Sequence, residues 1–406
     1  MTLVKRANLA ERLSSASREL KLFMAASFAM GVAYSLFDSV FNNFLNDHFS
    51  LSGFQRSFLE FPRELPGVLV VFISALLWFL CSRRLGVVSM LLGAVGALLI
   101  GFTSSTYAVL VVCLFIYSLG QHLFMPAASA IGMELAQEGK TGERLGQLNA
   151  IRNVAAILGS FLVFLGFKYL GFTYQHTYVL AAIGFVAAAF LMAAMTPEAN
   201  RQPHLFLKLH KEYKLYYLLA ILYGTRKQLF ITFAPWVIVT IFNQPTQTLA
   251  TLITLGGVIG ILFQPFLGWA TDKKGERFVL VLEAILLALV CLGYGFVRSI
   301  FQESIALFLV FVFYLLDQML MSVNMARAMY MKKIALRPED VQPALTAAVT
   351  LDHVFSITIA LVGGVIWTTF GFQYVFLMGV GIAILNLLAA LKIRPSRPGP
   401  TPIKGG

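Results

Sequence analysis

The sequence is dominated by long apolar segments that are separated by short polar loops. A helix that crosses a bilayer needs about 20 mostly apolar residues in a row. The chain is 58% hydrophobic and only 12% charged, with a mean hydropathy of +0.79. These values exclude a soluble domain and predict an all-α integral membrane protein. We predict twelve spans, at residues 22–46, 57–81, 86–104, 107–133, 143–167, 174–195, 214–242, 247–271, 277–297, 303–333, 341–368 and 372–392.

The net charge of +12 is not spread evenly along the chain. Lys and Arg gather in the tails and in every second loop, whereas the other loops contain only Arg56, Lys168 and Arg298. Cytoplasmic loops carry the excess of basic residues in membrane proteins. We therefore expect a multi-pass protein of the inner (cytoplasmic) cell membrane with both termini in the cytoplasm. The same distribution explains the basic charge without a nucleic-acid partner.

The second half of the chain repeats features of the first half at an offset of about 190–200 residues. We expect a cytoplasmic interfacial helix at 1–21, a six-helix bundle at 22–195, a cytoplasmic linker at 196–213, a second six-helix bundle at 214–392 and a disordered tail at 393–406. Paired six-span repeats are typical of transporters. The aligned residues are Tyr34, Asp38, Phe41, Tyr117 and Gln121 in the first half and Tyr223, Lys227, Phe230, Tyr314 and Gln318 in the second.

One short loop motif carries a family resemblance. The loop between spans eight and nine contains Gly268, Asp272, Lys273, Gly275 and Arg277. It resembles the G-x-x-x-D-R-x-G-R-R signature of the major facilitator superfamily, with Lys in place of the first Arg. We expect Asp272 to accept backbone N–H groups at a helix start. The equivalent first-half loop lacks the acid, and span five lacks the Gly-Pro signature of the antiporters.

With its twelve spans, the chain resembles this superfamily over essentially its full length. The resemblance implies two pseudo-symmetric six-helix bundles and no enzymatic activity. It also implies that spans one, four, seven and ten line a central cavity, which two, five, eight and eleven flank. The polar stripes of the sequence fall on these spans.

Charged side chains within the spans are the strongest functional signal, because an ionisable group in hydrocarbon normally has a partner and a function. We expect Asp38 to pair with Lys227 or Arg226, and Arg152 with Asp352. A proton on the acid, or an anionic solute at the base, would break such a pair and change which side is open. The candidates for proton coupling or gating are Asp38, Glu60, Arg63, Glu64, Asp317, Asp352 and His353.

Structural roles compete with these functional ones. Glu60 and Arg63 fit an intrahelical pair beside Pro62, because residues three apart share a helix face. Glu283 has no partner in its own span, so we expect a tertiary contact with a neighbouring helix. Arg327, near the inner end of span ten, is placed to extend its guanidinium toward the membrane surface.

An excess of bases favours an anionic solute, because the planar guanidinium matches a carboxylate or phosphate. Arg152, Arg226 and Lys227 are the predicted anion-binding residues. Predicted hydrogen-bonding residues are Tyr34, Tyr117, Gln121, Tyr223, Gln318 and Asn324, although helix packing is an equal alternative for the tyrosines.

The sequence thus predicts a secondary active transporter that works by alternating access, coupled to protons, for a small polar solute. We expect a monomer in the lipid bilayer with no cofactor and no metal site. The chain has no G-x-x-x-x-G-K-[ST] motif, so nothing in it indicates the use of ATP. A pump for amphipathic drugs or lipids fits the 36 Phe and 14 Met residues. A copper importer fits His122, Met125, Met321, Met325 and Met329. A non-transporting sensor and a membrane-embedded enzyme complete the alternatives.

Overall fold

The computed structural model describes residues 17–77, 79–137, 141–197, 210–337 and 340–394. Most of the predicted interfacial helix (1–21), linker (196–213) and tail (393–406) lies outside these residues. The described part is helical, without strands. Its elements are α2 (Arg18–Phe49), α3 (Gly53–Phe58), α4 (Glu60–Leu76), α5 (Ser82–Thr103), α6 (Tyr107–Glu134), α7 (Thr141–Tyr169), α8 (Tyr174–Ala193), η1 (Lys211–Tyr213), α9 (Lys214–Thr240), α10 (Thr246–Lys274), α11 (Glu276–Ile300), α12 (Glu303–Met321), α13 (Asn324–Ile334), α14 (Val341–Phe370) and α15 (Phe372–Leu391).

Ten described segments are long and apolar enough to cross a membrane, with α12 and α13 together forming one of them. The other two predicted spans are α9, which carries Arg226 and Lys227 near its middle, and the α3–α4 pair. Helices are the expected solution, because a backbone in lipid must satisfy its own hydrogen bonds. The prediction of an all-α, twelve-span membrane protein is confirmed.

Two predicted spans are interrupted. Span two, predicted at 57–81, consists of α3 and α4, which meet at Leu59 shortly before Pro62 and Pro66. Proline lacks the N–H that a continuous helix uses, so a break beside two prolines is expected. Span ten, predicted at 303–333, breaks between Met321 and Asn324, where the sequence contains neither proline nor glycine.

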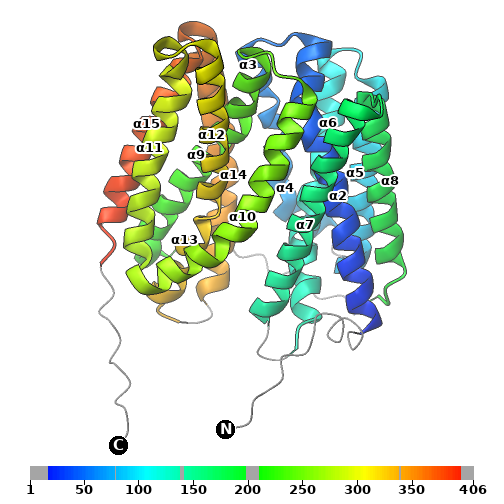
Figure 1. Ribbon diagram of the computed structural model, residues 1–406. Helices are drawn as coiled ribbons and strands as arrows, with labels where there is room; N and C mark the ends of the chain where they lie inside the picture. The colour runs from blue at the N-terminus through cyan, green and yellow to red at the C-terminus, as the bar shows by residue number, and fades with distance from the viewer. Residues whose placement is uncertain (1–16, 78, 138–140, 198–209, 338–339, 395–406) are drawn as a thin grey trace, which may run out of the picture. The chain divides into compact units, whose positions relative to one another are not determined.

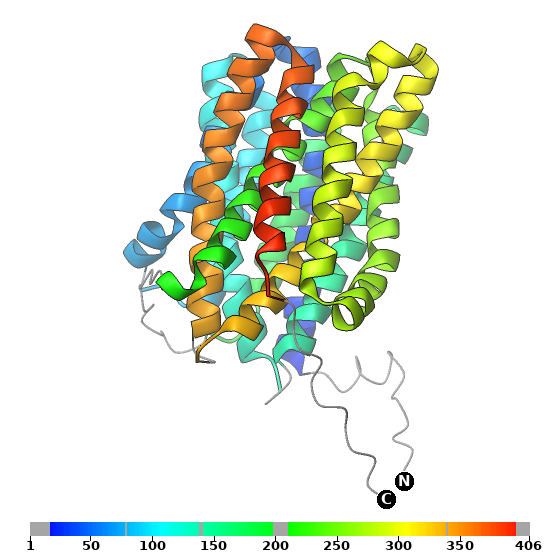
Figure 2. The ribbon, with the colours of Figure 1, turned by 90° about the vertical axis from the view of Figure 1, so that its left-hand side faces the viewer.

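The helices form two compact units, which we call unit 1 (Met1–Leu51, Phe61–Leu205, Asn243–Gly257) and unit 2 (Ser52–Glu60, Phe206–Phe242, Val258–Gly406). In unit 1, α2 packs on α7 and α8, and α5 packs on α6 and α8 (Figure 1). In unit 2, α15 lies between α11 and α14 (Figure 2), and α9 packs on α14 and α15.

Each unit includes a short segment from the other half of the sequence. The helix α3 joins unit 2, where the Phe54 backbone N–H donates to the Thr368 hydroxyl at 3.1 Å. The start of α10 joins unit 1, where the hydroxyls of Thr254 and Ser160 lie 2.8 Å apart. The division of the chain at 196–213 stays a prediction.

Candidate functional site

In unit 1, the intramembrane acid Asp38 lies next to a base. Arg63 Nη2 on α4 is 3.3 Å from Asp38 Oδ1 on α2, and the side chains are 17% and 45% exposed. Ser118 on α6 donates its hydroxyl to the Arg63 carbonyl and thereby ties α4 to α6. The partners predicted for Asp38, Lys227 and Arg226, belong to unit 2, so that pairing stays a prediction.

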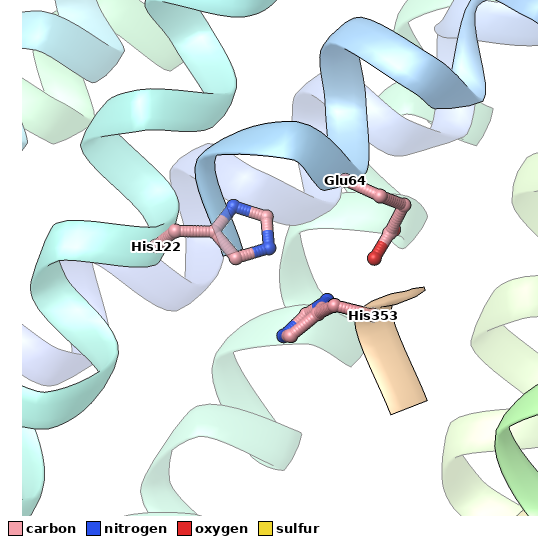
Figure 3. Close-up of side chains that lie close together, drawn as sticks. All are labelled: Glu64, His122 and His353. Carbon is pink, nitrogen blue, oxygen red and sulfur yellow. The ribbon is translucent and has the colours of Figure 1, made fainter. Parts of the chain in front are cut away.

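His122 on α6 is buried beside the same segment of α4. Its Nδ1 lies 2.9 Å from the Ser118 carbonyl, so this nitrogen carries the proton when it bonds to the carbonyl, and Nε2 is then an acceptor. A carboxylate oxygen of Glu64 lies within 4.8 Å of a ring nitrogen of His122 (Figure 3). Ser118 is therefore a residue that the sequence analysis missed, and His122 was named there only for the copper alternative. His353, also labelled in Figure 3, belongs to α14 of unit 2 and is 7% exposed.

Arg152 on α7 is a half-buried base whose partner is neutral. Its Nη2 donates to the Asn149 amide oxygen at 2.6 Å. No carboxylate in the described part of the chain contacts Arg152. A guanidinium in a membrane span with no acidic partner is costly unless another anion compensates it.

Unit 2 contains a chain of four buried charges that runs from α12 to α13. Asp317 Oδ1 is 2.6 Å from Arg226 Nη1, and Glu283 Oε1 is 3.4 Å from Arg226 Nη2. The other oxygen of Glu283 lies 2.7 Å from Arg327 Nη2. All four side chains are at most 2% exposed. Two acids and two bases thus neutralise one another inside the unit, and Glu283 is the acid that both arginines share.

This chain changes two of the sequence-based interpretations. The tertiary contact expected for Glu283 is confirmed. The expectation that Arg327 extends to the membrane surface is wrong, because its side chain is 1% exposed and its Nε donates to the Leu219 carbonyl. Paired burial satisfies the guanidinium where it is, so it has no need to reach water.

Tyr223 lies beside both arginines at the break in span ten. Its ring centroid is 5.3 Å from the Arg226 guanidinium and 4.7 Å from that of Arg327, which are cation–π distances. Its hydroxyl donates to the Met321 carbonyl at 3.0 Å, at the last residue of α12. The carbonyl of Met321, at the end of α12, therefore accepts a hydrogen bond from another helix.

A second, more accessible pair lies on α9 and α14. Lys227 Nζ is 2.6 Å from Asp352 Oδ2, and the side chains are 21% and 17% exposed. The Ser356 hydroxyl donates to the other oxygen of Asp352. A Cβ on Gly224 would lie 2.0 Å from that oxygen, so only glycine lets the carboxylate approach α9 this closely. The predicted pair of Arg152 with Asp352 would join two units and stays a prediction.

Glu60 has a different partner from the one predicted. Arg56 Nη1 lies 2.7 Å from Glu60 Oε1, four residues along the chain, and the side chains are 0% and 1% exposed. Gln228 on α9 donates to the other carboxylate oxygen at 2.9 Å. The interpretation of Glu60 and Arg63 as a pair is therefore wrong. The i, i+4 spacing from Arg56 was the available signal, but Arg56 had been assigned to a loop.

The loop that resembles the family signature also differs from expectation. Asp272 is exposed in the last turn of α10 and makes no hydrogen bond among the described residues, so its predicted role at a helix start is wrong. Lys273 lies over the Trp269 ring at 5.1 Å. The acid that ties this region together is Glu276 at the start of α11, 2.7 Å from Lys333 on α13.

Unit 1 has the same type of contact with the charges reversed. Arg83 on α5 lies 2.7 Å from Glu134 on α6, and it also donates to the Thr196 carbonyl. The Arg83–Glu134 pair and the Glu276–Lys333 pair each connect the start of one helix to the last turn of a neighbouring helix. The repeat therefore places an ion pair at the same position in each unit and inverts its polarity.

A tyrosine at the end of the linker closes a loop in unit 2. The Tyr213 hydroxyl donates to Asp340 Oδ2 at 2.6 Å and accepts from the Leu336 backbone N–H at 3.0 Å. The hydrogen bond to the carboxylate raises the pKa of Tyr213, because the acceptor favours the protonated phenol. Tyr213 thus holds the segment between α13 and α14 against the start of α9.

Known proteins share this architecture. A family model described as Major Facilitator Superfamily matches residues 216–406. The crystal structure of the nucleoside transporter NupG matches with a TM-score of 0.71 at 13% identity, covering 92% of this chain and all of that chain. The second half of the chain thus matches the major facilitator superfamily, and the whole chain shares the fold of the solved transporter. The match and the shared fold indicate a multi-pass membrane transporter and not an enzyme.

Two further structures show the same fold. A POT family transporter in complex with 5-aminolevulinic acid matches at TM-score 0.72 and 11% identity, over 93% of this chain and 97% of that chain. A D-xylose-proton symporter matches at TM-score 0.65 and 16% identity, over 92% and 96%. No curated protein sequence matches the chain.

Proposed function

We propose that this protein is a secondary active transporter that works by alternating access and moves a small anionic solute together with protons. Secondary transport is supported by the fold, which it shares with a nucleoside transporter and with a D-xylose-proton symporter. The observation that carries the anion preference is Arg152. The nearby acids neutralise Arg226 and Lys227 within unit 2, whereas the side-chain partner of Arg152 among the described residues is the neutral Asn149.

In this proposal, Arg152 binds the charged group of the solute. A carboxylate or phosphate offers two oxygens to the planar guanidinium, which adds geometric selectivity to the charge. Lys227 and Arg226 become further anion-binding groups when their acids are protonated. Gln121, Tyr223, Gln318 and Asn324 are the proposed hydrogen-bonding residues for the rest of the solute.

Arg152→Ala is expected to lower uptake of the anionic solute into proteoliposomes at least about tenfold, since hydrogen bonds to charged groups contribute about 1.5–3 kcal/mol. The solute is first found by thermal unfolding with panels of organic anions, sugars, lipophilic cations and Cu⁺. Arg152→Lys keeps the charge but loses the planar guanidinium that can bond to two oxygens at once, so it should recover only part of the uptake. Arg144→Ala is the matched control, because Arg144 also lies on α7 and also donates to a side-chain amide three residues away, that of Gln147.

Equal uptake by Arg152→Ala and Arg144→Ala would overturn the anion assignment. Stabilisation of both variants by lipophilic cations would instead support efflux of amphipathic compounds. Stabilisation by Cu⁺ alone would support copper import.

Proton coupling is assigned chiefly to Asp38, which is half exposed and lies beside Arg63. Asp38→Asn removes the titrating carboxylate, so solute uptake should lose its dependence on a pH gradient while solute binding persists. The measurement is uptake with and without an imposed gradient, with Glu303→Gln as a control at an exposed pair. A gradient dependence that survives in Asp38→Asn would move the coupling to the other candidates, Glu60, Glu64, Asp317, Asp352 and His353.

The location follows from the charge distribution of the loops. We propose a monomer in the cytoplasmic membrane with both termini in the cytoplasm, since the basic loops fall on that side. On this orientation, the Arg83–Glu134 and Glu276–Lys333 pairs lie at the cytoplasmic ends of their helices.

A further inference from the structure

The interior of unit 1 contains three tyrosine hydroxyls that are buried without a hydrogen-bond partner among the described residues. They belong to Tyr34 on α2, Tyr117 on α6 and Tyr178 on α8. The side chains of Tyr117 and Tyr178 are 1% and 0% exposed. Buried polar groups nearly always have a partner, and ordered water provides one where the protein does not. Three such hydroxyls in one small region therefore indicate bound water.

The rings that carry the three hydroxyls gather around Phe37, and Tyr34 lies one turn before the intramembrane acid Asp38 on α2. The rings of Tyr34 and Tyr117 meet edge to face with centroids 6.0 Å apart, and Phe37 touches Tyr117 and Tyr178 at 3.8 and 5.4 Å. A water molecule at this position has the two to four polar partners that buried water needs.

The polar line continues toward the end of α2. Tyr174 lies one turn before Tyr178 on α8. The ring of Phe44 lies beside both, with its centroid 5.3 Å from that of Tyr178 and 5.7 Å from that of Tyr174. The Tyr174 hydroxyl donates to Asp47 Oδ2 at 2.5 Å. Asp47 is exposed near the end of α2, nine residues after Asp38, which corresponds to about 14 Å along the helix axis.

We propose that ordered water molecules bind between Tyr34, Tyr117 and Tyr178 and connect Asp38 to Asp47, forming a proton path through the interior of unit 1. The proton-carrying role rests on the proposed function; the water binding does not. In this proposal Tyr34 and Tyr117 bind water, whereas the sequence analysis predicted that they bind the solute.

Proton movement along this path leaves each water molecule and each phenol with as many protons as it had before, and only Asp38 gains a proton. Each water or phenol oxygen accepts a proton from the Asp47 side and releases its own proton to the next oxygen, so one proton enters for each that reaches the Asp38 carboxylate. Arg63 is a charged group that faces Asp38. Protonation of Asp38 removes the attraction that holds Arg63, which couples arrival of the proton to a change in unit 1.

Thermal unfolding of the purified protein tests the water binding independently of transport. Tyr117→Phe and Tyr178→Phe keep the ring and remove only the hydroxyl. If each hydroxyl bonds to water, both variants should lower the Tm by about 1–3 °C. Tyr374→Phe on α15, where the side chain is 50% exposed, is the control and should leave the Tm unchanged. An unchanged or higher Tm in the two variants means dry hydroxyls and overturns the proposal.

Proton uptake into proteoliposomes under an imposed pH gradient tests the path. Tyr178→Phe interrupts the line between Tyr117 and Tyr174, so uptake should slow at least about tenfold, a change of about 1.4 kcal/mol in the barrier. Tyr374→Phe should match the wild type. Normal uptake in Tyr178→Phe overturns the path while the proposed coupling stands. Absence of proton uptake in the wild-type protein overturns the coupling and the path together, and the Tm measurement still decides the water binding.

Discussion

Glu283→Gln is expected to destabilise unit 2 more than any other single change of comparable size. The Glu283 carboxylate is fully buried and contacts both Arg226 and Arg327. Its loss leaves two buried guanidinium groups and one acid, Asp317, which pairs with Arg226. Removing one partner of a buried ion pair costs about 3–5 kcal/mol, because the remaining charge stays desolvated without compensation.

The measurement is thermal and denaturant unfolding of the purified protein in detergent. Glu303→Gln is the matched control, since Glu303 pairs with Arg298 at 3.1 Å but both side chains are about half exposed. An exposed pair contributes about 0–1 kcal/mol. Similar Tm values for the two variants would contradict the stabilising role of the buried charges.

A double variant separates charge from packing. Arg327→Gln in the Glu283→Gln background removes the base that was left without its acid. If compensation of charge is the cause, the double variant should be less destabilised than the sum of the single variants by about 0.5–3 kcal/mol. Strict additivity would show that the two residues contribute independently through their packing.

Gly96→Ala is expected to have the second-largest effect, because α5 and α6 touch through this glycine. A Cβ at Gly96 would lie 2.5 Å from the Tyr117 Cα, which is backbone and has no other rotamer to adopt. The helices must then move apart, at a cost of about 1–3 kcal/mol for overpacking. Small residues are common where membrane helices approach this closely.

Gly381→Ala is the control that isolates this contact. Gly381 also lies within a helix, α15, but a Cβ there meets nothing within 4 Å. Both substitutions gain the same helix propensity, about 1 kcal/mol in favour of alanine. The Tm should therefore fall for Gly96→Ala and stay level or rise for Gly381→Ala. Because Gly96 contacts Tyr117, its variant should also slow proton uptake. Equal Tm values would mean that α5 and α6 adjust without strain.

The sequence by itself predicted the membrane class, the number of spans and the resemblance to a transporter superfamily. Hydropathy is sufficient for the spans because lipid leaves the backbone no alternative to the helix. Helical periodicity also placed Tyr34 and Asp38 one turn apart on α2, as the structure has them. The expectation that intramembrane charges have partners rested on desolvation alone and did not need the fold.

Only the tertiary structure decided which partner each charge has. The pairs Arg226–Asp317 and Lys227–Asp352 join residues 91 and 125 positions apart, and their formation depends on the rotation and height of each helix. Hydropathy contains neither quantity, so the sequence predicted charged spans but not these pairs. The break in span ten has the same origin, because no local sequence signal marks it. Tyr223 on α9 donates to the Met321 carbonyl before the break, and Arg327 after the break donates to the Leu219 carbonyl on α9. The buried hydroxyls of Tyr117 and Tyr178 became recognisable as unpaired only once α2, α6 and α8 were packed together, because pairing is a property of neighbours in space.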